Sequence, residues 1–287
     1  VTAAQSFNIS EDAANSASVA SVSASDADSS GSITGFSIDA GNTGSAFAID
    51  AGGAITVNNA TAIDYESATS FTLAITATDG INTSAAENVT INIDDVNDTA
   101  PVIAAAQSFA IDENAADTTT VGTVSASDVD TVGSITAFDI TGGNSGTAFA
   151  IDASGVISVN NSSALDYESA TSFTLAITAS DGTNTSAAQN VTVTLNDSND
   201  NAPVIDASQS FSLDEGTADT TLVGTVTASD VDTVASITAF SITDGNTGTA
   251  FAIDSSGQIT VNDSSQIDAE ASTSFTLVVT ARILRTR

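Results

Sequence analysis

Hydrophobic and polar residues alternate in short runs along this chain, and clusters of Gly, Asn, Asp and Ser separate the runs. In FTLAITA, residues 71–77, the apolar positions are Phe71, Leu73, Ile75 and Ala77, with Thr or Ala between them. Alternation with a period of two is typical of a strand that buries one face. No helical period of useful length competes with it. The pattern therefore predicts an all-β chain.

Seven short strands are expected in the first hundred residues. They lie near residues 5–9, 18–25, 32–38, 46–49, 54–57, 70–77 and 88–93. Seven strands in a segment of this length favour an antiparallel sandwich of the immunoglobulin-like kind. Each such sandwich is large enough to bury its own core.

The same pattern recurs with an offset of 102 residues. DYESATSFTLAITA occupies residues 64–77 and again 166–179, and DAEASTSFTLVVTA occupies 268–281. The only two prolines, Pro101 and Pro203, share the offset and mark linkers. A fixed period indicates tandem domains. We predict three repeats, at residues 1–100, 101–202 and 203–281.

The last six residues, RILRTR at 282–287, break the repeat. They stand where the second repeat has SDGTNT, and they can be an out-of-frame translation of a similar stretch. We expect this basic tail to be aberrant, through a frameshift or a scar from cloning. The third sandwich should then lack its last strand. Its open sheet edge could pair with another chain or reduce stability.

Charge is strongly asymmetric along the chain. All 36 acidic residues precede residue 282, whereas the three basic residues are Arg282, Arg285 and Arg287. Such an acidic body should repel nucleic acid and anionic membranes. Either the acidic surface is only solvated, as in secreted proteins from salty habitats, or metal ions from solution supply the missing cations. The placement of the carboxylates decides between these interpretations.

Absent residue types exclude several chemistries. Without Cys, His or Lys, the chain has no disulfide, thiol nucleophile, His base, Schiff-base lysine or usual zinc ligand. Oxygen ligands remain in quantity, and they suit calcium. No apolar run is long enough to cross a membrane. With no Met and no signal peptide, we expect a processed or excised piece of a longer protein.

The acidic residues cluster at expected strand ends. Glu11, residues 64–66 and residues 95–98 should meet at one pole of the first sandwich, since loops from alternate strand ends collect at opposite poles. DAD at 26–28 and Asp79 should meet at the other pole, as should their counterparts in later repeats. The bottom pole of one sandwich would thus face the top pole of the next.

This arrangement strongly resembles the cadherin repeat. Five motifs of the family occur in order: a strand-A glutamate, DxD, a variant of LDRE, AxDG, and DxNDN before proline. The LDRE variant reads IDYE, LDYE and IDAE in the three repeats. DDVNDTAP departs from the last motif at Thr99, whereas NDSNDNAP matches in full. Tyr65 and Tyr167 replace the usual Arg of LDRE, and packing explains them better than function. The resemblance covers the chain up to Ala281 and implies tandem Greek-key sandwiches.

The resemblance also implies three calcium ions at each linker. The first set would comprise Glu11, Asp64, Glu66, the Val96 carbonyl, Asn97, Asp98, the Thr99 carbonyl, Asp128, Asp130 and Asp181. The second would comprise Glu113, Asp166, Glu168, the Ser198 carbonyl, Asn199, Asp200, the Asn201 carbonyl, Asp230 and Asp232. Seven carboxylates in the first set nearly balance three divalent ions. Ile283 stands at the position of Asp181, so the second linker should bind calcium more weakly.

Two further clusters resemble half-sites. Asp26, Asp28 and Asp79 have no preceding repeat, and Glu215, Asp268 and Glu270 have no following linker. We therefore expect a section of a longer array. The alternative to calcium sites is that these clusters are ordinary Asp-rich turns in an acidic β-protein that binds no metal.

The resemblance implies a structural and adhesive function at the cell surface or outside the cell. Near-identical repeats without Cys resemble the calcium-stiffened spacer of a large secreted bacterial adhesin that mediates attachment. Expected partners are neighbouring repeats, with a homophilic or glycan partner left open, and neither nucleic acid nor direct membrane insertion is expected. The alternative is a calcium-dependent carbohydrate-binding or self-associating module of a polysaccharide-active protein, although Trp is absent. Carboxylate pairs could serve a glycosidase, but calcium already accounts for them, so no enzyme is expected.

Overall fold

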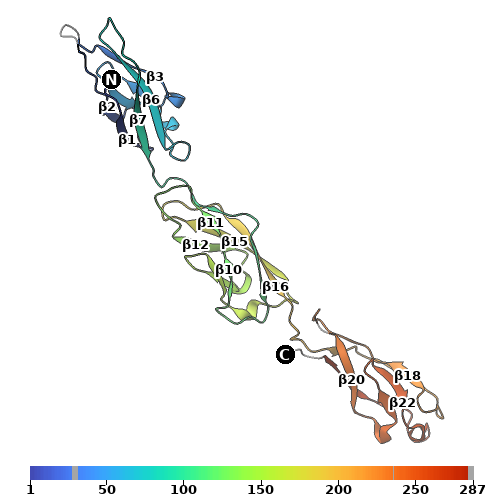
Figure 1. Cartoon of the computed structure of the whole chain (residues 1–287). Helices are drawn as coiled ribbons and strands as arrows, with labels where there is room; N and C mark the ends of the chain where they lie inside the picture. Colours follow the sequence, from blue (N-terminus) through green and yellow to red (C-terminus); the bar gives the residue numbers. More distant parts are fainter. Residues whose placement is uncertain (28–31, 235, 284–287) are drawn as a thin grey trace.

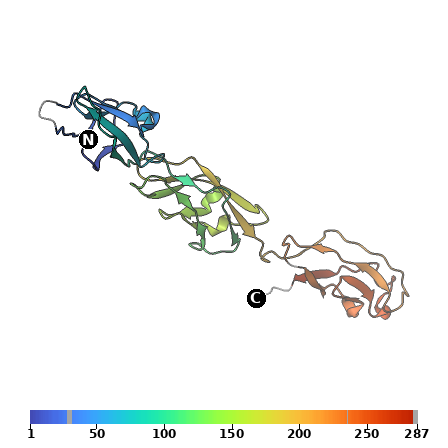
Figure 2. The same ribbon diagram turned by 45° about the horizontal axis from the view of Figure 1, so that its top comes forward.

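The chain folds into three β-sandwiches that follow one another end to end (Figure 1). This computed structural model describes residues 1–27, 32–234 and 236–283. The turned view shows the same linear arrangement (Figure 2). The helices are short 3-10 turns: η1 Thr43–Ser45, η2 Ala60–Ala62, η3 Ser145–Thr147, η4 Ser162–Ala164, η5 Thr247–Thr249 and η6 Ser264–Gln266. Within the described ranges, no helix is long and apolar enough to cross a membrane.

The first sandwich contains the seven strands that the alternating pattern predicts. They are β1 Gln5–Ser10, β2 Ser18–Ser21, β3 Gly35–Ala40, β4 Phe47–Ile49, β5 Ala54–Val57, β6 Ser70–Thr78 and β7 Glu87–Asp94. They form two sheets with strand orders β1-β7-β6-β3 and β2-β5-β4. The all-β sandwich prediction is therefore confirmed.

The second sandwich repeats this arrangement with two short additional strands. Its strands are β8 Val102–Ile103, β9 Ser108–Asp112, β10 Thr120–Thr123, β11 Ala126–Ser127, β12 Ala137–Gly142, β13 Phe149–Ile151, β14 Val156–Val159, β15 Ser172–Ser180 and β16 Gln189–Asn196. The sheets are β12-β15-β16-β9, β10-β14-β13 and the pair β11-β8. The chain leaving the linker thus joins one face as β8 before it crosses to the other as β9.

One strand pairing differs from the expected antiparallel pattern. β1 runs parallel to β7, with Phe7 opposite Ile91, and β9 runs parallel to β16. The chain enters each sandwich at one pole and leaves it at the opposite pole. Its first and last strands must therefore point the same way, and they meet at the edge of one sheet.

The long central strand carries the core. Leu73 and Ile75 on β6 are fully buried, as are Leu175 and Ile177 on β15. The alternate positions Thr72, Ala74 and Thr76 are exposed or half-buried, as the alternation predicts. A T-shaped aromatic pair joins the two sheets, with 5.2 Å between the ring centroids of Phe47 and Phe71.

The third sandwich has a different edge. Its strands are β17 Val204–Ile205, β18 Leu222–Thr225, β19 Ala228–Ser229, β20 Ile237–Asp244, β21 Phe251–Ile253, β22 Gln258–Val261 and β23 Val278–Ile283. Among the described residues, β23 pairs only with β20, so no strand corresponds to β7 or β16. That the third repeat lacks its last strand stays a prediction. The residues expected to form an aberrant tail continue β23 as far as Ile283, and residues 284–287 lie outside the described part.

The central strand is more deeply buried in the second sandwich than in the third, so equivalent substitutions should destabilise the two sandwiches to different extents. Leu175→Ala should lower the free energy of opening of the second sandwich by about 2–5 kcal/mol, because it leaves a cavity beside a fully buried strand. Leu277→Ala, at the corresponding half-buried position, should cost clearly less. Hydrogen exchange with mass spectrometry of the full chain measures each repeat separately. Exposed Thr174→Ala is the control, and equal losses at Leu175 and Leu277 would contradict the assignment of the core.

Candidate metal centres at the junctions

Carboxylates from two sandwiches converge at the first junction. In each of three overlapping groups, one carboxylate oxygen per residue lies within 4.8 Å of the others. The groups are Glu11, Asp64 and Glu66; Glu66, Asp95 and Asp130; and Asp128, Asp130 and Asp181. Glu66 links the first group to the second, and Asp130 links the second to the third. A continuous row of acidic side chains therefore runs from the first sandwich into the second.

Glu11 anchors the first-repeat end of this row. It follows β1 directly and is buried, with 7% of its surface exposed. Its Oε2 accepts a hydrogen bond from the Tyr65 backbone N–H at 2.6 Å, and its Oε1 accepts one from Val96 N–H at 2.7 Å. One carboxylate thus holds both the acidic turn before β6 and the linker after β7.

Hydrogen bonds also cross from the linker into the second sandwich. Asp95 Oδ2 accepts from the backbone N–H and the hydroxyl of Thr131, and from Val132 N–H at 3.1 Å. In the opposite direction, Asp130 Oδ2 accepts from Thr99 N–H at 3.0 Å. These bonds position two carboxylates from different segments against each other.

Asn97 lies among the carboxylates of the third group. With its nitrogen turned toward them, the side-chain amide donates to Asp130 Oδ2 at 3.2 Å and to Asp181 Oδ2 at 2.8 Å. The opposite orientation presents the amide oxygen at the same place, as coordination of a cation would require. Asn184 Nδ2 also contacts the Asn97 backbone carbonyl, at 3.4 Å.

Several carboxylate oxygens at the junctions are buried without a protein hydrogen-bond partner. In the first junction these are Asp95 Oδ1, Asp128 Oδ2 and Asp130 Oδ1, and in the second Asp197 Oδ1 and Asp230 Oδ2. A buried unpaired carboxylate oxygen is costly unless a cation or donor compensates it. Hard oxygen ligands in this density match the preference of calcium. The residues present therefore fit a bound divalent cation.

The pKa values of two carboxyl groups at the first junction are shifted by their surroundings. Desolvation, together with the nearby carboxylates of Glu11, Asp130 and Asp95, raises the pKa of Glu66 to about 7. Asp181 behaves differently, since backbone hydrogen bonds from Asn184 and Thr183 lower the pKa of its carboxyl group. Asp181 is therefore ionised at neutral pH, whereas Glu66 is divided between its two protonation states.

The second junction repeats the first nearly residue for residue. Buried Glu113 accepts from Tyr167 N–H at 2.5 Å and from Ser198 N–H at 2.7 Å. The acidic groups are Glu113, Glu168 and Asp200, and then Glu168, Asp197 and Asp232. Asp232 also accepts from Asn201 N–H at 3.1 Å. Desolvation and the neighbouring Glu113, Asp232 and Asp197 carboxylates raise the pKa of Glu168.

The two junctions differ at one position of the acidic groups. Where the second sandwich presents Asp181 beside Asp128 and Asp130, the third presents Ile283 at the end of β23. Ile283 is buried and lies opposite Ile237 in the strand pairing. The corresponding carboxylate is therefore replaced by an apolar side chain.

Sequence reasoning overlooked two members of the rows. Asp95 and Asp197 begin the DxNDN motif, so the sequence already contained the signal for both. Asp98 accepts a hydrogen bond from Thr99 Oγ1 at 3.3 Å, and Asp166 accepts two from Ser169. The carbonyl ligands at Val96, Thr99, Ser198 and Asn201, together with Asn199, stay predictions.

The half-sites at the two ends of the chain are less complete. Asp28 lies outside the described residues, and Asp79 accepts from Ile81 and Asn82 N–H at 2.7 and 2.6 Å. At the other end, Glu215 accepts from Ala269 N–H at 3.1 Å and is exposed, unlike its buried counterparts Glu11 and Glu113. A following linker contributes to the burial of this glutamate in the first two repeats.

Comparison with known proteins identifies the repeats. The family model described as "Cadherin domain" matches residues 5–94, 107–196 and 209–284. The chain is 32% identical to human Protocadherin Fat 4 over 233 residues and 30% identical to mouse Cadherin-related family member 2 over 224. These alignments cover 78% and 69% of this chain, but only 5% and 17% of the two relatives.

Solved structures agree on the fold. The EC1-3 segment of mouse Protocadherin-24 superimposes with a TM-score of 0.66 at 24% identity, covering 94% of this chain and 86% of that structure. Identity at this level supports the fold alone. Cadherin domains bind calcium at the linkers between repeats, and the acidic rows described above lie at those places.

Proposed function

The chain belongs to the cadherin family, and from that premise we propose that it is a calcium-stiffened spacer within an extracellular adhesion protein. The observation that carries the proposal is the convergence of buried, unpaired carboxylate oxygens from two sandwiches at each junction. Neither sandwich supplies the six to eight oxygen ligands that calcium prefers. Metal binding is thereby coupled to the geometry between neighbouring repeats.

The proposed ligands are those expected from the sequence, with one aspartate added to each linker. At the first junction they are Glu11, Asp64, Glu66, Asp95, the Val96 carbonyl, Asn97, Asp98, the Thr99 carbonyl, Asp128, Asp130 and Asp181. At the second they are Glu113, Asp166, Glu168, Asp197, the Ser198 carbonyl, Asn199, Asp200, the Asn201 carbonyl, Asp230 and Asp232. Three divalent ions per linker would offset most of the negative charge of the first set.

Calcium would act here as a counter-charge and a template. Two carboxylates about 4 Å apart repel by about 1 kcal/mol in water, and by several times that near a protein surface. Hydrogen bonds such as Asp130 with Thr99 bring the linker against the second sandwich, but they leave this repulsion in place. A bound cation converts it into attraction, so the loaded junction resists bending.

The setting we propose is a long repetitive adhesin of the bacterial surface. Two features support this: the 14-residue identity between repeats one and two, and the absence of Cys from an extracellular type of domain. In such a protein, stiff repeats hold a binding domain away from the cell. Neighbouring repeats are then the immediate partners of each sandwich.

Calcium removal tests the spacer directly. Small-angle scattering of the full chain in calcium should fit an extended rod, and excess chelator should shorten its maximum dimension and broaden the distribution of shapes, because the carboxylates then repel. Circular dichroism should stay nearly constant, since each sandwich has its own core. An identical scattering curve with and without chelator would refute the proposal.

Substitution of one shared ligand separates the two junctions. Glu168→Ala should weaken calcium binding at the second junction by about tenfold or more, since the residue belongs to both of its acidic groups. Titration calorimetry measures the loss, and the first junction should be unaffected. Asp139→Ala, which removes one exposed charge from β12, is the matched control. Equal calcium binding in both variants would mean that the ligand set is wrong.

Calcium affinity at the first junction should depend on pH near neutrality. The pKa of Glu66 is raised to about 7, so a proton competes with the cation below that pH. Affinity should rise as pH increases from 6 to 8 and then level off. Titrations in buffers of different ionisation enthalpy measure the proton released. Glu66→Gln should bind calcium more weakly and lose most of this pH dependence. A wild-type calcium affinity that stays constant from pH 6 to 8 would contradict the prediction.

A further inference from the structure

Aspartate is followed directly by glycine at three places in the chain, and the structure sets one of these pairs apart. The pairs are Asp79-Gly80, Asp181-Gly182 and Asp244-Gly245. The first two occupy the same position of their repeats, directly after β6 and β15. The third pair has no counterpart, because the first repeat has Ala40 and the second has Gly142 where the third has Asp244.

Hydrogen bonds keep the carboxyl group and the glycine nitrogen of the first pair apart. Asp79 Oδ1 accepts from the backbone N–H groups of Ile81 and Asn82, at 2.7 and 2.6 Å. The Gly80 N–H donates instead to the hydroxyl of Thr78, at 3.1 Å. The second pair repeats these three bonds one period later, at 2.6, 2.6 and 3.1 Å. In both pairs the two donors stabilise the ionised carboxylate, and the glycine nitrogen is directed at another oxygen.

Asp244 and Gly245 have the opposite arrangement. Asp244 is the last residue of β20, and its side chain is exposed to water. The Gly245 backbone N–H donates to Asp244 Oδ1 at 2.7 Å, and no other donor in the described part of the chain bonds to this carboxyl group. The glycine nitrogen is therefore directed at the carboxyl group of the preceding residue, close to the carbon Cγ that bears Oδ1.

The turn that holds Gly245 is the same as in the second sandwich. Gly245 has a φ of +76°, and a Cβ at this position would lie 1.8 Å from the carbonyl oxygen of Thr276. Gly143 has a φ of +74° and the same close approach to the neighbouring strand. One residue further on, the Asn246 side chain donates to the Phe251 carbonyl at 2.8 Å and accepts from its N–H at 2.9 Å. Contacts on both sides thus fix the position of the glycine nitrogen.

We propose that Asp244 is a site of spontaneous covalent modification, at which aspartate converts to isoaspartate through a cyclic succinimide. The Gly245 nitrogen attacks Cγ of the protonated carboxyl group, and the carboxyl OH leaves with the amide proton as water. A second water molecule then adds to the main-chain carbonyl carbon of Asp244, whose bond to nitrogen breaks, so that the backbone runs through Cγ. One water is released and one is consumed, without an oxidant or a cofactor. Reacting groups held about 3–3.5 Å apart favour such an intramolecular step.

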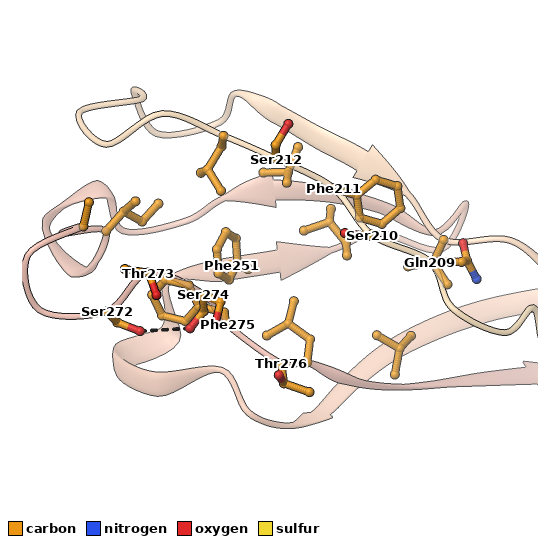
Figure 3. A pocket seen from close by; sticks show the side chains of 18 of the residues that line it. Gln209, Ser210, Phe211, Ser212, Phe251, Ser272, Thr273, Ser274, Phe275 and Thr276 are labelled. Atoms are coloured by element: carbon orange, nitrogen blue, oxygen red, sulfur yellow. Dashed lines mark hydrogen bonds between the residues drawn. The ribbon is translucent and has the colours of Figure 1, made fainter.

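Isoaspartate at this position would disturb the contact between the two sheets of the third sandwich. It lengthens the main chain by one carbon directly before Gly245, where the Thr276 carbonyl leaves no room even for a Cβ. The turn must then move, and Asn246 carries this movement to Phe251 through its two hydrogen bonds. Figure 3 shows Phe251 beside Phe275, with 5.1 Å between the ring centroids of this T-shaped pair. The modification therefore loosens the third core and leaves the other two unchanged.

Ageing of the full chain at neutral pH tests this assignment. Chelator is present, so that bound metal cannot protect Asp181. Pepsin digestion followed by electron-transfer fragmentation, which distinguishes isoaspartate from aspartate, measures all three pairs in one sample. Isoaspartate should form at Asp244 at least about tenfold faster than at Asp79 or Asp181, because only Asp244 is aligned with the nitrogen that attacks it. In guanidinium chloride, where the pairs have no fixed geometry, the three rates should become similar.

Two variants separate the effect of the turn from that of its surroundings. Gly142→Asp introduces an Asp-Gly pair at the same turn of the second sandwich, where a Cβ would lie 3.6 Å from the Ala176 Cβ, an ordinary contact. Isoaspartate should form at position 142 at a rate similar to that at position 244. Asp244→Ala, which introduces the residue of the first repeat, should leave the rates at Asp79 and Asp181 unchanged. Equal rates at positions 79, 181 and 244 in the folded chain would overturn the proposal, as would an unreactive position 142.

Discussion

Repulsion between carboxylates at the junctions is the constraint on which the elongated structure depends. Each sandwich folds around its own core, but the surfaces that meet between sandwiches carry Glu66, Asp95 and Asp130 within a few ångströms of one another. Hydrogen bonds from backbone N–H groups orient Asp95 and Asp130 without neutralising them. A cation is the natural complement, and under the proposed function the relation between neighbouring sandwiches depends on a component from solution.

The core strands position the acidic side chains at the junctions. β6 and β15 follow directly from the acidic turns, and their buried Leu and Ile residues hold these turns against Glu11 and Glu113. The same glutamates accept from the linkers at Val96 and Ser198. Packing inside one sandwich thus sets the positions of carboxylates that meet those of the next. The third repeat shows the converse, because Glu215 is exposed and the described residues include no linker segment that donates to it.

Prediction from the sequence succeeded where a local rule applied. Period-two alternation located all seven strands of the first sandwich, and the inward positions Phe71, Leu73 and Ile75 are buried. It did not reveal the parallel pairing of β1 with β7, since pairing direction depends on where the chain enters and leaves the sandwich. Asp95 and Asp197 were overlooked although their motif was recognised, because only the folded linker shows that they face Asp130 and Asp232.

The sequence by itself determined the repeat period, the strand positions, the family and the kind of ion that the acidic loops suit, since all of these depend on residue type and spacing. The tertiary structure decided which carboxylates share a site, because residues such as Glu66 and Asp130 meet only when two poles come together. It also showed that Phe211 and Phe275 of the third sandwich contact distant Gly224 and Phe251. Such contacts join residues far apart in the chain, and no local pattern specifies them.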